Sequence, residues 1–386
     1  MSVSVSSLLR AVRRQCPAER AGLAVGAPQL LAVLGSVSDP RARRGVRHRV
    51  GAILGVAVCA VLAGARSYTA IAEWSLDLAP GVRARLGLGR RPPSESTIRR
   101  VLQRLDADQL DRAVSEWLAR RSGLSPGRRV IAVDGRTVRG ARTYDGRAVH
   151  LLAAFDTATG TVLAQTCVDG KPNEITAFAP LLDRLDVTDA LVTADALHTQ
   201  RGHATYLTGR GAHYLLTVKA NQPGLLAELA ALPWTQVPVA DRTTNTSHGR
   251  VEQRTVQLAT VTTGIGFPHA VTALRIARRS RRRTNARWHT ETVYAITDLT
   301  TTQADPAELA DALRAHWSVE NRLHWVRDDV TFGEDLSQVR THHGPTVMAT
   351  LRNLAISLHR QAEATNIAAA CRHLSRRPHR VLQLIT

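Results

Sequence analysis

The stretch "RRVIAVDG", Arg128–Gly135, marks the point where the sequence changes from helix-forming to strand-forming. Its β-branched residues predict a short strand that ends at Asp134. Two further runs, "AVHLLAAFD" from Ala148 and "TVLAQTCVD" from Thr161, flank the turn sequence "TATG" and predict a hairpin. The core therefore begins with one strand followed by a hairpin.

The elements after the hairpin alternate between helix and strand. "NEITAFAPLLDRLD" predicts a helix with Asn173 as its N-cap, and "ALVTADA" predicts a strand that ends on Asp195. A polar helical stretch begins at Thr199, and "HYLLTVKA" predicts another strand. This order of strand, hairpin, helix, strand, helix and strand is that of the ribonuclease H-like α/β fold, which we predict for the core.

The chain has 386 residues, more than the ~250 to 300 at which single cores stop growing. Threonine- and valine-rich runs predict a β-rich insertion after the core strands, and helices are expected at both ends of the chain. The insertion contains the basic stretch "ARRSRRRTNAR" from Ala277, expected as a loop that either contacts a phosphate backbone or is simply solvated. The expected division is 1–125 for an all-α N-terminal domain, 126–222 for the first part of the core, 223–297 for the insertion, and 298–386 for the second part with C-terminal helices.

The chain carries a formal net charge of +19, from 51 Lys+Arg and 32 Asp+Glu. Such an excess points to a polyanionic partner, most often nucleic acid. The first 125 residues hold 20 arginines and nine acids. There, "PPSESTIRRVLQRLD" predicts a helix that starts at Ser94 or Ser96. Its polar face, with Arg99, Arg100 and Arg104, is either a DNA-recognition surface or an ordinary solvated face.

Four cysteines, Cys16, Cys59, Cys167 and Cys371, show no short spacing, so neither a disulfide framework nor a thiolate metal site is predicted. A reducing cytoplasm is the expected compartment. The apolar run from Val50 to Ala65 is shorter than the ~18 to 20 residues that a membrane span needs. We therefore expect a buried helix and no membrane partner.

Asp134 and Asp195 each close a predicted apolar strand, where α/β proteins place functional side chains. Either aspartate alone is a common turn former. Two buried carboxylates together repel unless a cation joins them, and oxygen ligands suit Mg²⁺ or Mn²⁺. A pair of such ions can stabilise both the attacking and the leaving oxygen of a displacement at phosphorus.

A third carboxylate lies on a later helix, whose start is marked by Asp305 at the N-cap and Pro306 at the first helical position. At 100° per residue Glu320 faces inward. It shares one broad stripe with Leu313, His316, Leu323, His324 and Arg327.

The same helix supports a rival interpretation, in which His316, Glu320 and His324 bind zinc by themselves. That site would account for neither aspartate nor for the positive charge. Taken singly, these histidines and Trp317 and Trp325 would be expected to pack in a core.

Six motifs follow one another in an order that resembles one bacterial family. They are "VIAVDGRTVRGAR", "DGKPNEITAFAPLLDRLD", "ALVTADALHTQ", "YLLTVKANQP", "HGRVEQR" and "HWSVENRLHW…DVTFGEDLSQVR". Over nearly its whole length the chain resembles insertion-sequence DDE transposases of the H-repeat-associated type, including the helical N-terminal module. The resemblance implies a catalytic triad of Asp134, Asp195 and Glu320, a β-rich insertion and a multimer that brings transposon ends together. Along the helix that carries the glutamate, the wider superfamily has Tyr, Arg and Lys at the positions where this chain has Leu313, His316 and Arg327.

The expected function is metal-dependent cleavage and strand transfer of double-stranded DNA by a homo-oligomer, with Mg²⁺ or Mn²⁺, two ions, held by the triad. No Walker-type glycine loop is present, so no nucleotide cofactor is expected. A copy that binds DNA without cutting it and a nuclease without strand transfer are the alternatives. The residues expected to contact DNA are Arg99, Arg100, Arg104, Arg136, Lys171, Lys219, His316, Trp317, Trp325 and Arg327.

Overall fold

The computed structural model describes residues 29–121, 127–142, 148–168, 173–247, 250–261, 265–282 and 287–385. The helices before the sheet are α2 (Leu30–Gly35), α3 (Val50–Leu62), α4 (Tyr68–Leu76), α5 (Pro80–Arg85), α6 (Glu95–Arg104) and α7 (Ala107–Arg121). The strands are β1 (Val130–Arg142), β2 (Ala148–Asp156), β3 (Thr161–Val168), β4 (Leu191–Ala194), β5 (His213–Val218), β6 (Val239–Ser247), β7 (Arg250–Thr260), β8 (Thr272–Arg282) and β9 (His289–Thr297). The later helices are α8 (Glu174–Leu182), α9 (Arg201–Gly209), α10 (Pro223–Ala230), α11 (Pro306–Val319), α12 (Gly344–Gln361), α13 (Ile367–Ser375) and α14 (Pro378–Ile385).

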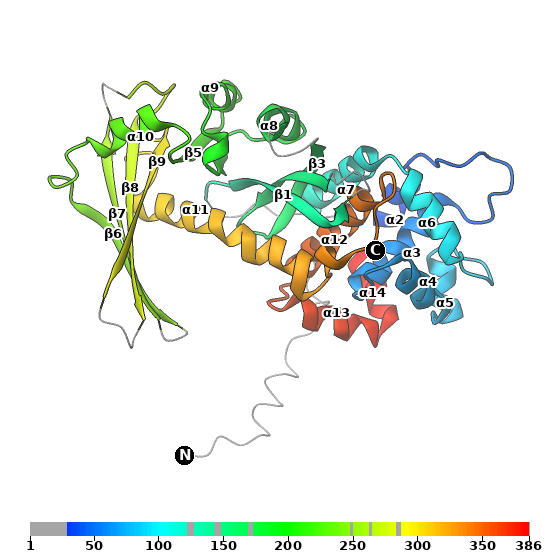
Figure 1. Ribbon diagram of the computed structural model, residues 1–386. Helices are drawn as coiled ribbons and strands as arrows, with labels where there is room; N and C mark the ends of the chain where they lie inside the picture. The colour runs from blue at the N-terminus through cyan, green and yellow to red at the C-terminus, as the bar shows by residue number, and fades with distance from the viewer. Residues whose placement is uncertain are drawn as a thin grey trace, which may run out of the picture.

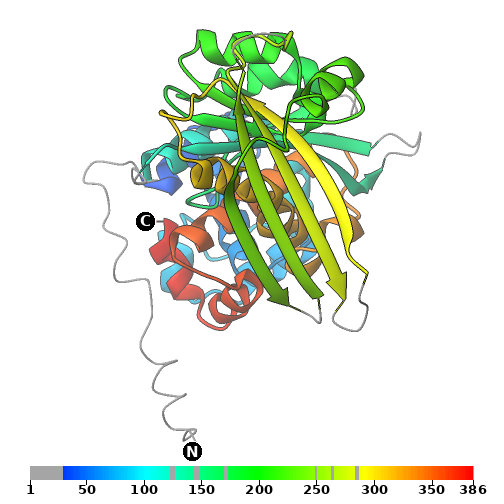
Figure 2. The ribbon, with the colours of Figure 1, turned by 90° about the vertical axis from the view of Figure 1, so that its left-hand side faces the viewer.

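All nine strands belong to one mixed sheet, in the order β3-β2-β1-β4-β5-β9-β8-β7-β6. Strands β1, β4 and β5 are parallel to one another, and the remaining pairs are antiparallel. The β-rich segment after β5 rejoins the sheet through β9, which pairs with β5 from Leu215↔Thr297 to Val218↔Tyr294. The outer strands β6–β9 therefore extend the core sheet instead of forming a separate one (Figures 1 and 2).

Helices cover both faces of the sheet. Because successive side chains of a strand point to opposite faces, β5 contributes Tyr214 and Leu216 to one hydrophobic cluster and Leu215 to another. The first cluster includes Phe178 of α8, and the second includes Leu309 of α11. Figure 1 shows α11 running from the outer strands, below β1, toward the helices at the other end of the molecule.

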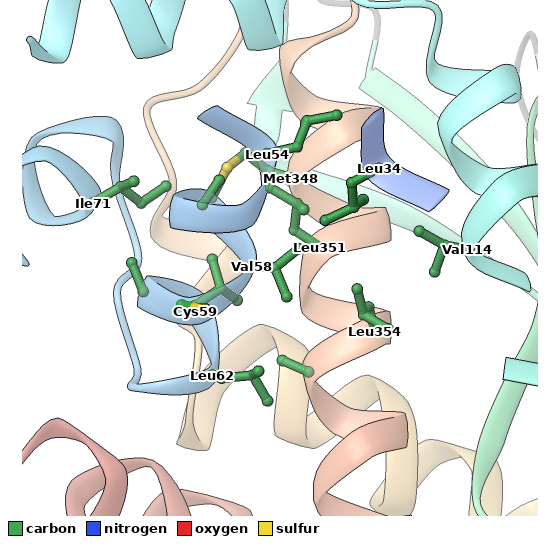
Figure 3. Close-up of a cluster of buried hydrophobic side chains, with 14 of the residues drawn as sticks. Leu34, Leu54, Val58, Cys59, Leu62, Ile71, Val114, Met348, Leu351 and Leu354 are labelled. Atoms are coloured by element: carbon green, nitrogen blue, oxygen red, sulfur yellow. The ribbon is translucent and has the colours of Figure 1, made fainter. Parts of the chain in front are cut away.

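Helices from the two ends of the chain share a single hydrophobic core. Twelve of the 13 residues of α3 are buried, which confirms the buried helix expected from its apolar sequence. In Figure 3 the side chains of Leu54 and Val58 of α3 lie against Met348 and Leu351 of α12. Throughout the described residues, every helix is too short or too polar to span a bilayer.

Most expected elements lie where the sequence places them, including the hairpin of β2 and β3 and the helix that starts after Ser94. Two expectations were wrong. Strand β1 continues through Asp134 to Arg142, because β2 pairs with it as far as Ala148. The first part of the basic stretch is not a loop, because Ala277 to Ser280 of β8 pair with both neighbouring strands, and Arg281 and Arg282 pair with β7.

Candidate active site

Asp134 and Asp195 lie side by side on neighbouring parallel strands. The register pairs Val133 of β1 with Ala194 of β4, so the next residue of each strand is an aspartate. Residues paired in this way point to the same face of a sheet. Asp134 Oδ1 accepts a hydrogen bond from the N–H of Gly135 at 3.0 Å, and Asp195 Oδ1 accepts one from the N–H of Leu197 at 2.9 Å. Local backbone donors thus fix the direction of both carboxylates.

Glu320 lies at the end of the helix α11, where the helical winding changes. The helix α11 begins after Asp305, whose side chain caps Ala307, and ends at Val319. Two π-helical segments follow, η4 (Glu320–His324) and η5 (Val326–Val330). A π turn bonds residue i to i+5 and adds a residue per turn, so the helical wheel at 100° per residue does not hold beyond α11. Glu320 faces the two aspartates across a cavity, and 65% of its side chain is exposed.

The three carboxylates nevertheless converge on one cavity of about 210 Å³. The residues that line it are Asp134, Asp195, Thr217, Lys219, His316, Trp317 and Glu320. They lie on β1, β5 and α11, or directly after β4, β5 and α11, so the fold brings together side chains that are far apart in the sequence. Thr217 was not among the expected site residues, since a threonine within a strand carries no distinguishing signal.

His324, which the sequence suggested only as a ligand of the rival zinc site, also belongs to this site. Its Nε2 lies 3.0 Å from Oδ2 of Asp134, and its side chain is 2% exposed. Ligand atoms of Asp134, Glu320 and His324 all lie within 4.8 Å of one another, and no other trio of potential ligands meets this criterion in the described part of the chain.

The rival zinc site of His316, Glu320 and His324 is not assembled in the structure. His316 is absent from the group formed by Asp134, Glu320 and His324, and its Nδ1 lies 3.2 Å from Thr193 Oγ1.

The electrostatics of the site favour an ionised Asp134 and make His316 less basic than a free imidazole. Burial alone would raise the pKa of Asp134, but the hydrogen bond and charge of His324, with the charge of His316, hold it below its usual value. Burial lowers the pKa of His316, against the opposing charges of Asp134 and Asp195. Carboxylate oxygens around a small cavity fit the ligand preference of Mg²⁺ and Mn²⁺.

Arg136 lies beside the cavity but is held by acidic side chains. Its Nη1 is 3.5 Å from Oε1 of Glu320, its Nη2 is 3.6 Å from Oδ2 of Asp335, and it also pairs with Asp328. Asp328 is buried, and Asp329 is exposed. The first aspartate of this pair therefore anchors Arg136.

Arg327, predicted to contact a DNA phosphate, lies inside the protein. Its side chain is 1% exposed, and its Nε lies 2.7 Å from Oε2 of Glu334, which is itself fully buried. Arg327 Nη1 reaches Gln165 and Asn353 at 3.4 and 3.3 Å. Every one of these contacts lies inside the protein, so Arg327 is not available to a ligand in this structure.

The remaining expected contacts lie on the surface. Arg99, Arg100 and Arg104 are exposed on α6, and Arg99 pairs with Glu95 at 3.0 Å. Trp317 and Trp325 are 38% and 53% exposed, so the core-packing interpretation was wrong for both rings. Lys171 lies outside the described residues.

Comparisons with known proteins give the family. A family model described as "Transposase DDE domain" matches residues 125–358, and one described as "DDE_Tnp_1-associated" matches residues 31–118. The "Putative transposase YncI" of Escherichia coli O157:H7 is 30% identical over 353 residues, covering 86% of this chain and 88% of that protein. The "H repeat-associated putative transposase YhhI" of Escherichia coli strain K12 is 29% identical over 348 residues, covering 86% and 90%.

Among solved structures, a piggyBac transposase synaptic complex with hairpin DNA matches with a TM-score of 0.42 at 11% identity, covering 90% of this chain and 76% of that one. The sequence matches confirm the resemblance found in the motifs: the chain belongs to the family of transposases with a DDE domain.

Proposed function

We propose that this protein is a DDE transposase that cleaves double-stranded DNA at the ends of an insertion sequence and joins those ends to a target. The observation that carries the proposal is the convergence of Asp134, Asp195 and Glu320, from three separate elements, on one cavity that also presents Lys219. Asp134, Asp195 and Glu320 would hold Mg²⁺ or Mn²⁺, two ions in all.

We further propose that the core is ribonuclease H-like. The order β3-β2-β1-β4-β5, with β1, β4 and β5 parallel and the β2–β3 hairpin antiparallel, supports this assignment. The division into an N-terminal helical domain, a split core and an inserted sheet is part of the same proposal. In this scheme Asp134 lies on β1 and Asp195 directly follows the neighbouring strand β4.

Divalent cations bound at this site would stabilise the charge that develops on the attacking and leaving oxygens of an in-line displacement at phosphorus. The protein supplies the fixed parts of that arrangement. Backbone N–H groups orient the two aspartates, His324 holds Asp134 from the opposite side, and Arg136 steadies Glu320. Such preorganisation places the ligands before DNA arrives.

The reaction has two displacements. In the first, water attacks the phosphorus of a phosphodiester at the transposon end, and the bond to the 3′ oxygen breaks to leave a 3′-hydroxyl and a 5′-phosphate. In the second, that 3′-hydroxyl attacks a phosphodiester of the target, and the 3′ oxygen on the target strand leaves. The second step exchanges one phosphodiester for another and requires no nucleotide.

DNA contacts at the site would come from the exposed cavity residues. The Lys219 ammonium is placed to pair with a backbone phosphate, and the ring of Trp317 can stack on an unpaired base. Arg99, Arg100 and Arg104 of α6 would contact the duplex further away. Pairing of two transposon ends by a homo-oligomer on DNA completes the proposal.

The test is cleavage of the DNA that flanks the gene, with Mg²⁺ or Mn²⁺, by wild type and by Glu320→Gln. This substitution keeps the shape of the side chain and removes its charge, so we expect cleavage to fall at least 100-fold with DNA binding retained. Glu308→Gln, in the first turn of the same helix, is the matched control and should cut normally. Undiminished cleavage by Glu320→Gln would overturn the triad. Wild-type protein that binds these ends without cutting would favour the DNA-binding alternative.

A further inference from the structure

A buried glutamate lies directly behind the two aspartates and has no part in the mechanism above. Glu174, the first residue of α8, is 3% exposed. Its Oε1 lies 2.6 Å from Nε2 of His150 on β2, and its Oε2 lies 3.4 Å from Nε2 of His198. Nδ1 of His150 is in turn 2.9 Å from the hydroxyl of Thr137 on β1. One carboxylate thus connects four elements.

Glu174 contacts both turns that orient the aspartates. On one side it packs against Gly135 so closely that a Cβ on that glycine would overlap the carboxylate. Gly135 also supplies the N–H that orients Asp134. On the other side Glu174 holds His198, the last residue of the turn η3 (Ala196–His198), and that turn supplies the Leu197 N–H bound by Asp195.

Aromatic packing keeps His198 in place. The ring of Phe178, one turn along α8 from Glu174, lies 5.1 Å from the ring of His198 and stacks on His203 at 4.1 Å. The ring nitrogens of His203 lie 3.1 and 3.0 Å from the carbonyl oxygens of His198 and Ile175. The turn after Asp195 is therefore fixed to α8 by contacts that begin at Glu174.

We propose that Glu174 is a positioning residue, an inference that rests on the proposed function. Acting through Gly135 and His198, it sets the separation of the Asp134 and Asp195 carboxylates. A buried charge held by two histidines is costly compared with an apolar side chain of the same volume. What the charge provides is a fixed spacing between two turns on neighbouring strands. Side chains that orient metal ligands in this way commonly change metal affinity by about 10- to 100-fold when removed.

The experiment measures Mn²⁺ binding without DNA, by the electron paramagnetic resonance signal of the free ion. Glu174→Gln should fold, as judged by circular dichroism, and raise the Mn²⁺ dissociation constant at least 10-fold. The matched control is Asp111→Asn, because Asp111 is also a buried acid that accepts a backbone hydrogen bond, from Gln165 at 2.9 Å, and lies on α7. It should bind Mn²⁺ like wild type.

A second pair of variants tests the contact with Gly135 even if Glu174→Gln fails to fold. Gly135→Ala should weaken Mn²⁺ binding by displacing the carboxylate, and adding Gly135→Ala to Glu174→Ala should have little further effect, since the overlapping group is gone. Wild-type affinity in Glu174→Gln or in Gly135→Ala overturns the positioning role alone. An equal loss in Asp111→Asn also overturns it. No Mn²⁺ binding by wild type overturns both the proposed metal site and the role of Glu174.

Discussion

Replacing Arg327 by methionine separates the role seen in the structure from the phosphate contact expected from the sequence. In the structure Arg327 and Glu334 form a fully buried pair at 2.7 Å, and Glu334 is also held by Arg352 at 2.7 Å. Removing one partner of a buried pair costs about 3 to 5 kcal/mol, because the other charge stays buried. Since Arg352 remains, we expect a loss of about 3 kcal/mol in the free energy of unfolding for Arg327→Met.

Urea unfolding followed by circular dichroism measures this loss. Arg120→Met is the matched control: Arg120 pairs with Glu116 on the surface at 3.3 Å, with both side chains more than half exposed, and its loss should cost about 0 to 1 kcal/mol. Adding Glu334→Gln to Arg327→Met should lower the stability further, because buried Arg352 then loses its ionised partner. If Arg327→Met unfolds like wild type but binds cleaved DNA ends more weakly, the phosphate role is correct and the reasoning from burial is refuted.

Two further predictions concern the shared helical core. Leu351→Ala should lower the free energy of unfolding by about 2 to 5 kcal/mol, because Leu351 of α12 is fully buried against α3. Calorimetry should show one lowered transition. N-terminal helices that melt separately at an unchanged temperature would contradict the shared core. The pKa of His359 is lowered by burial from its usual 6.5 to about 4, with Nε2 3.1 Å from the carbonyl of Leu62. Because the folded protein favours neutral His359, its contribution to stability is complete above pH 6.5. As the pH falls from 6.5 toward 4, the unfolded chain binds the proton first, and the free energy of unfolding should fall by about 3 kcal/mol. His359→Gln should flatten this part of the dependence of urea stability on pH, and an unchanged slope would refute it.

Local sequence signals located most helices and strands, and they located Asp195 and the N-cap Asp305. Asp195 follows a short strand, and Asp305 with Pro306 marks the start of α11, because strand ends and helix caps depend on neighbouring residues. The continuation of β1 beyond Asp134 depends on pairing with β2 after the turn. A "DG" pair by itself favours a turn, so the sequence suggested a strand end there.

The features that sequence reasoning missed depend on distant partners. The burial of Arg327 follows from Glu334 and Arg352, which no helical spacing identifies. The change to π-helical winding after Val319, which alters the direction of the side chains that follow, has no single-residue signature. The pairing of β9 with β5 likewise joins segments far apart in the sequence.

The helical core shared by both chain ends has a consequence for damaged gene copies. On the ribosome, the N-terminal helices are complete long before α12 emerges, so α3 stays uncovered until synthesis is nearly finished. A stop codon before Gly344 would leave the apolar surface of α3 exposed to proteases and to aggregation. A truncated chain would therefore be degraded as a whole, including the arginine-bearing helix α6.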